Sequence, residues 1–470
     1  MNVLLINPSL VAAEVHHYSK TLEKHRGIYP PLGLSYVAAS LINNGHKVII
    51  VDCDAVKDSW ESINKAITEI NPDIVGFYVM TWTFRQVKGL LSRIKSVKEN
   101  IISVTGGPNV SSFPKETLDF SDFDFGIQGE GEDAILELIN CIETKGDFSR
   151  IDGLIWRKEG QIIENQLRKY KDNLDDISFP SWQSLPIYSY SDVFTYNKHF
   201  ATMIATRGCP FNCTFCDRKN RMGKAWRSRS PENIVKEIML LKDNYGIKEF
   251  MFFDDNFILD KKWVYRLCDE IKSKDLDINW ECRARVDMVD GELLKSMRKS
   301  GCYRIRYGME SADNEILKVL KKDITVEQIK ESVKLTKQAG IEIFAYFMMG
   351  APQETEATLR KTIDLALEID ADFTLFSKVI LIVGSEIFEW AVDKGFIASD
   401  YWKDYLLGNE TNPAPSFSTS DLPEKVIDKY ISLANKKFYL RPHYIFKRLS
   451  SIKTFNQFKR QTLMASAFLK

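Results

Sequence analysis

The chain has 470 residues, enough to bury a large core, and this length favours two or three domains over one. Hydrophobic residues make up 44% and charged residues 27% of the chain, which excludes a disordered or fibrous protein. The 64 basic and 64 acidic residues cancel, so the excess positive charge of a nucleic-acid-binding protein is missing. We therefore expect a small or neutral substrate and no nucleic-acid partner.

The amino terminus lacks the basic stretch and long apolar run of a signal peptide, and no segment has 18 uninterrupted apolar residues. These features predict a cytoplasmic protein. Because the cytosol keeps thiols reduced, the eight cysteines are not expected to form a disulfide framework. Clustered cysteines in this setting suggest a metal.

Short β-rich runs alternate with helical patterns over residues 1–150. Strands separated by helices predict a doubly wound parallel sheet, with its ligand site at the carboxyl ends of the strands. The predicted strands are 2–7, 47–54, 73–79, 101–107 and 123–129.

Polar and glycine-containing loops occupy this edge of the predicted sheet, including "YPPLGL", "TWT", "TGGPN" and "GEGED". Paired glycines let the backbone approach a ligand closely, although each loop alone is also consistent with ordinary turn chemistry. Together the loops favour a bound ligand. The candidate binding residues are Pro30, Pro31, Leu32, Gly33, Thr81, Trp82, Thr105, Gly106, Gly107, Pro108, Gly129, Glu130, Gly131 and Glu132.

Residues 151–198 are rich in Pro, Ser and aromatic side chains and are expected to form a connector. The strand and helix alternation resumes over residues 199–385. Six strand–helix units at regular spacing predict a partial six-strand β/α barrel with its active site at the carboxyl ends of the strands. The predicted strands are 201–208, 249–255, 278–284, 304–310, 342–350 and 373–381.

Residues 386–470 favour a mainly helical region, which we expect to cap the substrate. From Arg441 onward there are seven Lys or Arg and no Asp or Glu, with Phe446, Leu449, Ile452 and Phe455 at helical spacing. Such a segment can lie on a membrane surface, but it more often packs on its own domain.

Three cysteines follow the first barrel strand in the segment "TRGCPFNCTFCDR": Cys209, Cys213 and Cys216. A structural zinc site needs four ligands, and the next cysteine, Cys268, lies 52 residues further along. A cubane iron–sulfur cluster with three protein thiolates keeps one iron open. The spacing therefore favours an iron–sulfur cluster over zinc.

The motif CxxxCxxC at this position resembles the signature of the radical S-adenosylmethionine (SAM) superfamily. "FFDDNF", "RARVD", "YGMES" and "GAPQET" follow in the order expected for that family. The resemblance implies a 4Fe–4S cluster held by the three cysteines, with SAM on the open iron. The residues that it assigns to SAM are Phe215, Asp254, Asp255, Arg285, Glu310, Ser311 and Gly350.

The first 190 residues are similar to the cobalamin-binding domain that precedes many radical SAM enzymes. "YPPLGLSYVAASLINNGHKVIIVD", "TGGPN" and "GEGEDAILEL" carry this resemblance. Related domains with a histidine on cobalt have D-x-H-x-x-G after the first strand, where this chain reads "NPSLVAA". Cobalamin is therefore expected to bind without histidine ligation from this loop.

Together the two resemblances imply a cobalamin-dependent radical SAM methyltransferase acting on an unactivated carbon, or less often phosphorus, of a small molecule, lipid or natural product. They also imply a one-electron reductant such as flavodoxin or ferredoxin. A radical cyclase, oxidase or rearranging enzyme without net methyl transfer is the alternative. A methylthiotransferase would need a second cysteine cluster, and only Cys53 and Cys141 occur in the first domain.

Overall fold

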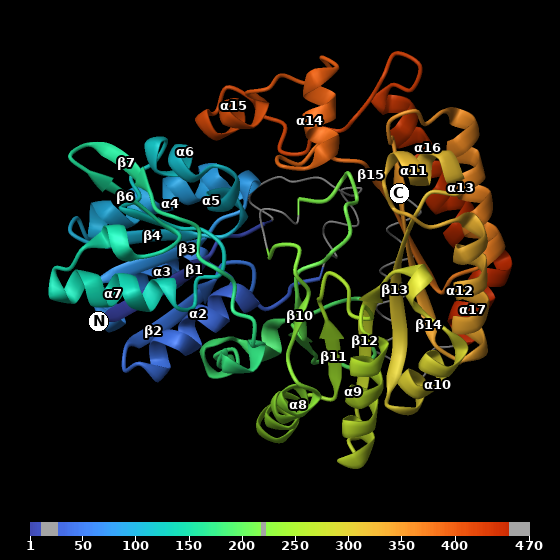
Figure 1. Cartoon of the computed structure of the whole chain (residues 1–470), viewed down its shortest axis with the longest axis horizontal. Helices are drawn as coiled ribbons and strands as arrows, with labels where there is room; N and C mark the ends of the chain where they lie inside the picture. Colours follow the sequence, from blue (N-terminus) through green and yellow to red (C-terminus); the bar gives the residue numbers. More distant parts are fainter. Residues whose placement is uncertain (11–26, 218–221, 451–470) are drawn as a thin grey trace.

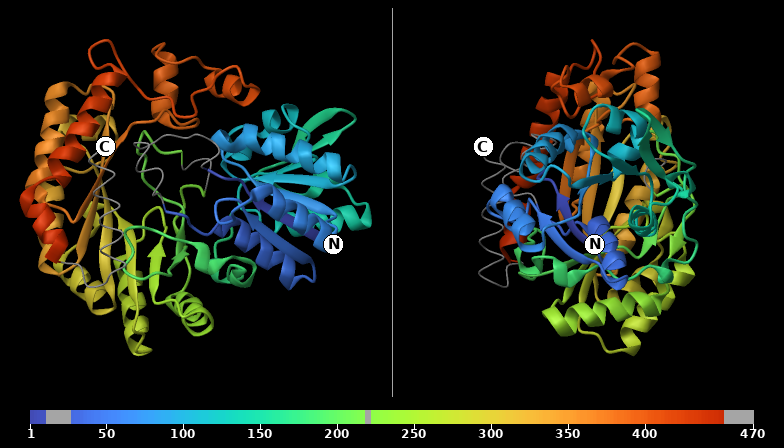
Figure 2. Two further views of the ribbon diagram at one scale, coloured as in Figure 1. Left: turned by 180° about the vertical axis from the view of Figure 1, so that it is seen from behind. Right: turned by 90° about the vertical axis from the view of Figure 1, so that its left-hand side faces the viewer.

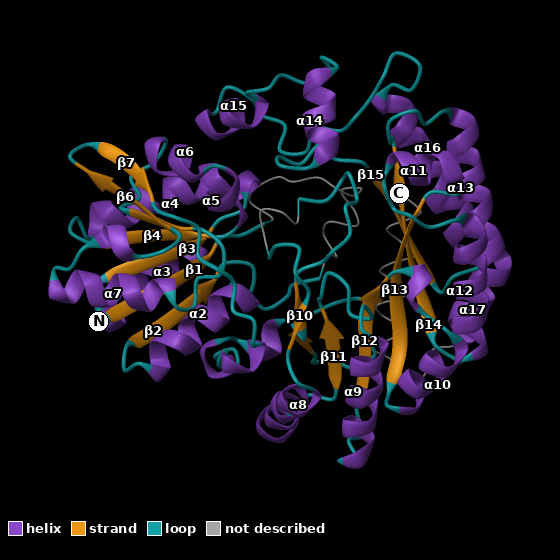
Figure 3. Cartoon of the chain, viewed as in Figure 1, coloured by secondary structure: helices purple, strands orange, loops and turns teal. Residues whose placement is uncertain are grey.

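The computed structural model describes residues 1–10, 27–217 and 222–450. Two sheets of mainly parallel strands form the two halves of the molecule, and the chain segment between them passes through the middle (Figure 1). Helices flank both sheets and also make up most of the carboxyl-terminal region (Figure 3). The predicted α/β fold class is confirmed.

The first sheet has the strand order β2-β1-β3-β4-β5-β6-β7, and its first five strands are parallel. Alternate residues of β1 face opposite sides: Val3 and Leu5 pack with α2 and α7, while Leu4 and Ile6 pack with α3 and α4. This two-sided burial explains the continuous apolar strands. The elements are β1 (Asn2–Asn7), α2 (Leu32–Asn43), β2 (Lys47–Asp52), α3 (Ser59–Ile70), β3 (Ile74–Tyr78), α4 (Phe84–Val97), β4 (Ile102–Gly106), α5 (Pro108–Ser112), α6 (Pro114–Asp119), β5 (Phe125–Ile127), α7 (Ala134–Thr144), β6 (Leu154–Lys158) and β7 (Gln161–Glu164).

The start of the expected connector, residues 151–198, belongs to this sheet. Strands β6 and β7 form an antiparallel hairpin that pairs with β5. Trp156 on β6 is buried and contacts the ring of Phe148. The rest of the segment runs through short 3-10 turns to the barrel. The domain boundaries themselves stay predictions.

The second sheet has six parallel strands in the order β8-β11-β12-β13-β14-β15, which confirms the partial barrel. Helices lie on its outer side (Figure 2). Helix α8 ends at Gly246, whose φ of 67° is the left-handed conformation expected of a glycine cap. The elements are β8 (Ala201–Met203), α8 (Pro231–Tyr245), β11 (Glu249–Phe252), α9 (Lys261–Ser273), β12 (Asn279–Ala284), α10 (Gly291–Lys299), β13 (Cys302–Glu310), α11 (Asn314–Val319), α12 (Val326–Gln338), β14 (Glu342–Met349), α13 (Glu356–Ile369) and β15 (Phe373–Lys378).

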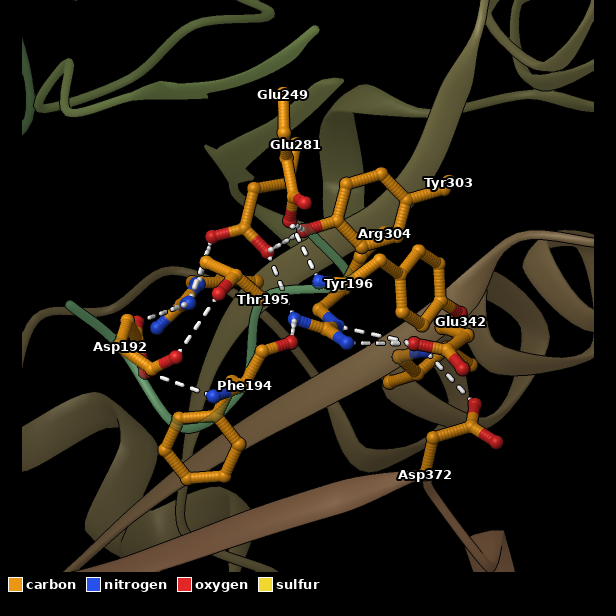
Figure 4. Close-up of polar contacts among 12 residues, drawn as sticks. Asp192, Phe194, Thr195, Tyr196, Glu249, Glu281, Tyr303, Arg304, Glu342 and Asp372 are labelled. Atoms are coloured by element: carbon orange, nitrogen blue, oxygen red, sulfur yellow. Dashed lines mark hydrogen bonds and ion pairs between the residues drawn. The ribbon is translucent and has the colours of Figure 1, made fainter. Parts of the chain in front are cut away.

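A buried network of charged side chains fills the barrel near the amino ends of its strands (Figure 4). Arg304 donates hydrogen bonds to Glu281 at 3.0 Å and Glu342 at 2.7 Å, and Arg306 donates to Glu281 at 2.7 Å. Glu249 accepts a hydrogen bond from the Tyr303 hydroxyl at 2.6 Å. Because each of these buried charges has a partner, the network closes this end of the barrel without an unpaired ion.

The carboxyl-terminal helices occupy two places. Helix α16 (Glu424–Tyr439) packs on β15 and α13, whereas α14 (Glu386–Asp393) and α15 (Tyr401–Leu407) lie across the top of both halves in Figure 1. The Tyr405 hydroxyl donates a hydrogen bond to the Trp82 carbonyl at 3.1 Å, so α15 touches the first domain. That this region caps a substrate stays a prediction.

Part of the basic terminal segment packs on the barrel. In α17 (Pro442–Ser450), Tyr444 is buried and Lys447 lies 3.2 Å from Asp372. Phe446 is 73% exposed, and Ile452 and Phe455 lie outside the described residues. No described helix is long and apolar enough to cross a membrane.

Candidate active site

The three cysteines of the motif lie on one loop between β9 (Thr206–Arg207) and β10 (Arg227–Ser228), which pair antiparallel. The loop begins at Gly208, whose φ is 86°, and a Cβ atom there would lie 2.1 Å from the Ala225 carbonyl oxygen. Only glycine fits this turn. The loop runs between the two sheets (Figure 1).

The cysteine loop is held on its barrel side by backbone bonds. The Thr214 amide donates to the Leu320 carbonyl at 3.0 Å, and the Cys216 amide donates to the Cys213 carbonyl at 3.2 Å. Cys209 and Cys213 are half-buried and Cys216 is exposed. Within the described ranges, no three His, Cys, Asp or Glu side chains already converge in a metal-binding arrangement. Three thiols on one short loop are nevertheless the donor set that an iron–sulfur cluster requires.

Two cations lie beside this loop. The Arg285 guanidinium stacks 3.8 Å from the centre of the Phe211 ring, and it pairs with Asp287 at 2.9 Å. Lys322 pairs with Glu310 at 2.8 Å. Burial works against the charge of Lys322, but the Glu310 carboxylate and the Cys213 thiol group together outweigh it and raise the pKa of the ammonium group. The buried Nη1 atom of Arg285 has no hydrogen-bond partner among the described residues, as expected of a group that binds an anionic ligand.

Lys322 was not among the sequence candidates, because it lies in the sequence "LKKD", which is typical of a solvated helix end. Its partner Glu310 has a φ of 63°, a left-handed conformation that costs energy in any residue but glycine. The next residue, Ser311, is fully buried. Strained backbone at this strand end agrees with a functional role for the "GMES" motif.

The acids after β11 differ in their surroundings. Asp254 is buried, and its Oδ1 accepts hydrogen bonds from the amides of Ala205 and Thr206, while its Oδ2 has no hydrogen-bond partner in the described part of the chain. Burial raises the pKa of Asp254 to about 7. Asp255 is exposed. Asn256 is buried, and neither its side-chain nitrogen nor its side-chain oxygen has a partner within residues 1–10, 27–217 and 222–450, a signal of ligand contact that sequence reasoning did not single out.

Gly350 follows β14 with a φ of 89°, and a Cβ atom there would meet Ile427 at 2.8 Å. Its amide donates to the Glu354 carboxylate at 2.6 Å, and the Ala351 amide donates to the same oxygen at 3.0 Å. Phe215, the remaining SAM candidate, lies partly buried, with its ring centre 5.9 Å from the Lys322 ammonium. The predicted SAM residues thus come from strand ends around one loop.

We expect Glu354→Gln to stabilise the protein at neutral pH. Burial raises the pKa of Glu354 to about 7 from 4.5, so the native state holds its proton more tightly than the unfolded state. The stability that the protonated carboxyl contributes is complete below about pH 4.5 and is lost as pH rises through about 7. The glutamine side chain keeps an oxygen that accepts from the Gly350 and Ala351 amides, and it does not ionise, so its contribution to stability does not fall with rising pH. Urea unfolding should show equal stability near pH 4 and an advantage of up to about 3 kcal/mol for the variant near pH 8. If the difference in the free energy of unfolding between the two proteins is the same near pH 4 and near pH 8, this expectation is wrong.

The loop "GEGED" of the first sheet holds both ends of the cysteine loop. Arg207 lies 3.0 Å from Glu130 and 2.7 Å from Glu132, and Arg227 pairs with Glu130 at 2.9 Å. Burial opposes ionisation of Glu130, but Arg227 and Arg207 together keep its pKa below the usual range. Both acids were predicted to bind cofactor, and the structure places them in ion pairs between the two halves. Neither arginine was predicted, although Arg207 is two residues from the first cysteine.

The other candidates of the first sheet line its carboxyl edge. Gly107 has a φ of 102°, and a Cβ atom there would lie 2.9 Å from the Val79 carbonyl oxygen. The buried Thr105 hydroxyl and the Asn109 Oδ1 have no hydrogen-bond partner in the part of the chain that the structure describes, which fits a polar ligand at this edge. In the loop after β1, the Ser9 hydroxyl donates a hydrogen bond to the Asp54 carboxylate at 2.7 Å. Residues 11–13, which continue this loop, lie outside the described residues.

The remaining candidates are exposed to different degrees. Pro30, Leu32 and Thr81 are buried, Pro31 and Trp82 are half-buried, and Gly33 is exposed. Gly129 has a positive φ of 76°, whereas Gly106, Pro108 and Gly131 have ordinary backbone conformations. Their roles toward a ligand stay predictions.

A parallel β/α barrel with three cysteines after its first strand, joined to a doubly wound sheet, defines a radical SAM protein with a second cofactor-type domain. The radical SAM superfamily matches residues 203–366, and the B12 binding domain family matches residues 18–139. An uncharacterized methyltransferase of Pyrococcus horikoshii is 32% identical over 419 residues, which cover 89% of each chain. The chain therefore belongs to the cobalamin-dependent radical SAM enzymes.

Two further comparisons match most of this chain. The anaerobic magnesium-protoporphyrin IX monomethyl ester cyclase of Rubrivivax gelatinosus is 28% identical over 402 residues, covering 84% of this chain and 70% of the cyclase. The solved structure of the radical enzyme OxsB with aqua-cobalamin and SAM bound has a TM-score of 0.77 at 17% identity. That match covers 99% of this chain and 71% of OxsB, and it shows the shared fold.

Proposed function

We propose that this protein is a cobalamin-dependent radical SAM methyltransferase that methylates an unactivated carbon, or less often a phosphorus, of a small molecule, lipid or natural product. The observation that carries the proposal is the direct attachment of the cysteine loop to the first domain. Arg207 and Arg227 connect both ends of that loop to Glu130. A cluster and a cobalamin bound at these two edges would share one site, as methyl transfer requires.

The residues would divide the work as follows. Cys209, Cys213 and Cys216 would hold three irons of the cluster. Arg285, through its unpartnered Nη1, would orient the carboxylate of SAM, and Glu310 would accept hydrogen bonds from the ribose hydroxyls. When bound, the cluster and SAM supply one-electron chemistry and cobalamin supplies the methyl group.

The carboxyl edge of the first sheet would hold cobalamin through close backbone approach at Gly107 and through polar contacts to Thr105. No histidine of the described first-strand loop is available as a cobalt ligand. A cytoplasmic location, a reductant such as flavodoxin or ferredoxin, and membrane contact through the basic terminal segment also belong to this proposal.

The test is an anaerobic reaction of protein reconstituted with iron, sulfide and cobalamin. SAM carrying a deuterated methyl group and a strong reductant are added, and products are analysed by mass spectrometry. We expect retained cobalamin, 5′-deoxyadenosine, S-adenosylhomocysteine and a deuteromethylated product from the correct substrate. Matched reactions without cobalamin should form 5′-deoxyadenosine but neither S-adenosylhomocysteine nor the deuteromethylated product.

The cyclase relative supplies the competing outcome. If the complete system forms 5′-deoxyadenosine while the deuteromethyl group is recovered only in methionine and uncleaved SAM, the protein is a radical cyclase, oxidase or rearranging enzyme, and methyl transfer is refuted.

A further inference from the structure

Arg283 on β12 differs from the other arginines of the barrel interior. Arg285, Arg304 and Arg306 each pair with a carboxylate. The Arg283 side chain forms no hydrogen bond or ion pair within the described part of the chain, and its guanidinium lies 4.4 Å from the centre of the Phe253 ring. It is only half-buried. A guanidinium in such a place has a strong unmet tendency to bind an anion.

The strand geometry directs Arg283 into the barrel. Side chains alternate along β12, and Trp280 and Cys282 are buried on the helix-covered face. The opposite face carries Glu281 and then Arg283. Glu281 pairs with Arg304 and Arg306 in the charged network that closes the amino end of the barrel, which we call the floor. Arg285, two residues further, stacks on the cysteine loop. Arg283 therefore lies between the closed floor of the barrel and the predicted cluster site.

A second chain of contacts connects Arg283 to the first domain. Its partner Phe253 packs against Tyr29, with ring centres 5.0 Å apart. Tyr29 begins the "YPPLGL" loop, whose next residues, Pro30 and Pro31, are predicted to face cobalamin. Arg283 thus lies between the two edges that hold reacting groups, where a substrate must bind.

The charges nearby leave Arg283 uncompensated. Its register partner on β13 is Arg306, a second cation, and Glu281 is already shared between Arg304 and Arg306. The Phe253 ring contacts the guanidinium but carries no net negative charge. A planar guanidinium held in this way matches the two oxygens of a carboxylate or of a phosphate-type group.

We propose that Arg283 binds an anionic group of the substrate, and that the substrate therefore carries a carboxylate, phosphate or phosphonate group. This inference rests on the proposed function, because it takes the space between the two cofactor edges as the substrate site. The oxyanion would lie on the floor side of the barrel, directing the rest of the substrate toward the cysteine loop.

Equilibrium dialysis with phenylphosphonate as the probe tests the proposal without turnover. The reconstituted protein, loaded with cobalamin and SAM, is dialysed without reductant, and bound probe is measured by mass spectrometry. We expect saturable binding by the wild type, weaker by about tenfold or more in Arg283→Gln and partly restored in Arg283→Lys. Arg298→Gln, which removes an exposed arginine on α10 without an ion pair in the described structure, should bind like the wild type.

Affinities for SAM and cobalamin are measured on the same variants. Unchanged values in Arg283→Gln support a substrate role, whereas a parallel loss of SAM affinity would reassign Arg283 to the SAM carboxylate and overturn the proposal. Failure of the wild type to bind the probe, or equal binding by Arg283→Gln, would also overturn it. These measurements do not depend on methyl transfer. If Arg283 binds the probe but no deuteromethyl group is transferred, the proposed function is refuted and the anion site stands.

Discussion

Alanine at any one of Cys209, Cys213 or Cys216 is expected to abolish reductive cleavage of SAM. Each thiolate would hold one iron of the cluster, and the loop offers no replacement ligand: within the described structure no fourth cysteine lies on it. Because the three thiolates act as a unit, each single variant should lose as much activity as the triple variant, about a thousandfold or more. Iron content, the visible absorption of the cluster and 5′-deoxyadenosine formation measure the loss.

Cys268→Ala is the matched control. Cys268 is buried on α9, away from the loop, and behaves as a small apolar side chain. The control should retain iron and 5′-deoxyadenosine formation at the wild-type level. Single loop variants that keep a substantial part of both would show that the cluster is held elsewhere.

Arg207→Ala is expected to loosen the attachment of the cysteine loop to the first domain. The substitution removes two ion pairs and leaves Glu132, itself buried, without its cationic partner. Breaking a buried pair by removing one partner typically costs about 3 to 5 kcal/mol. The guanidinium also lies 5.1 Å from the centre of the Tyr36 ring, and this contact would be lost as well. We expect a lower urea-unfolding midpoint together with faster loss of cobalamin on gel filtration.

Two comparison variants separate this effect from a general loss of charge. Arg207→Lys keeps the cation but cannot reach both carboxylates as a fork, so it should recover only part of the stability. Lys248→Ala removes an exposed pair with Asp277, 2.9 Å long, and should change stability by less than about 1 kcal/mol. If Arg207→Ala unfolds at the same urea concentration as the wild type and keeps its cobalamin, the ion pairs of Arg207 with Glu130 and Glu132 do not stabilise the attachment of the cysteine loop to the first domain.

Much of the fold could be predicted because periodicity depends on local sequence. The five parallel strands of the first sheet and the six of the barrel appear at the predicted places. Their apolar runs are buried on both faces, which is the pattern that parallel sheets impose. The β6–β7 hairpin was missed because the Pro-, Ser- and aromatic-rich stretch that follows it, residues 174–190, suggested a connector, and because its pairing with β5 is a tertiary contact.

The cysteine spacing and the flanking motifs by themselves determined the family, since a cluster with an open iron needs three thiolates on one short loop. They also determined which strand ends surround that loop. Only the tertiary structure decided which charges meet. Glu130 and Arg207 are 77 positions apart and Glu310 and Lys322 are 12 apart, and nothing in their local sequence identifies the partner. In "RARVD" both arginines are two residues from another charged residue, yet within the described chain Arg285 pairs with Asp287 of the same motif and the Arg283 side chain pairs with no carboxylate. The physical reason is that pairing depends on distance in space, which the chain path sets and local composition does not.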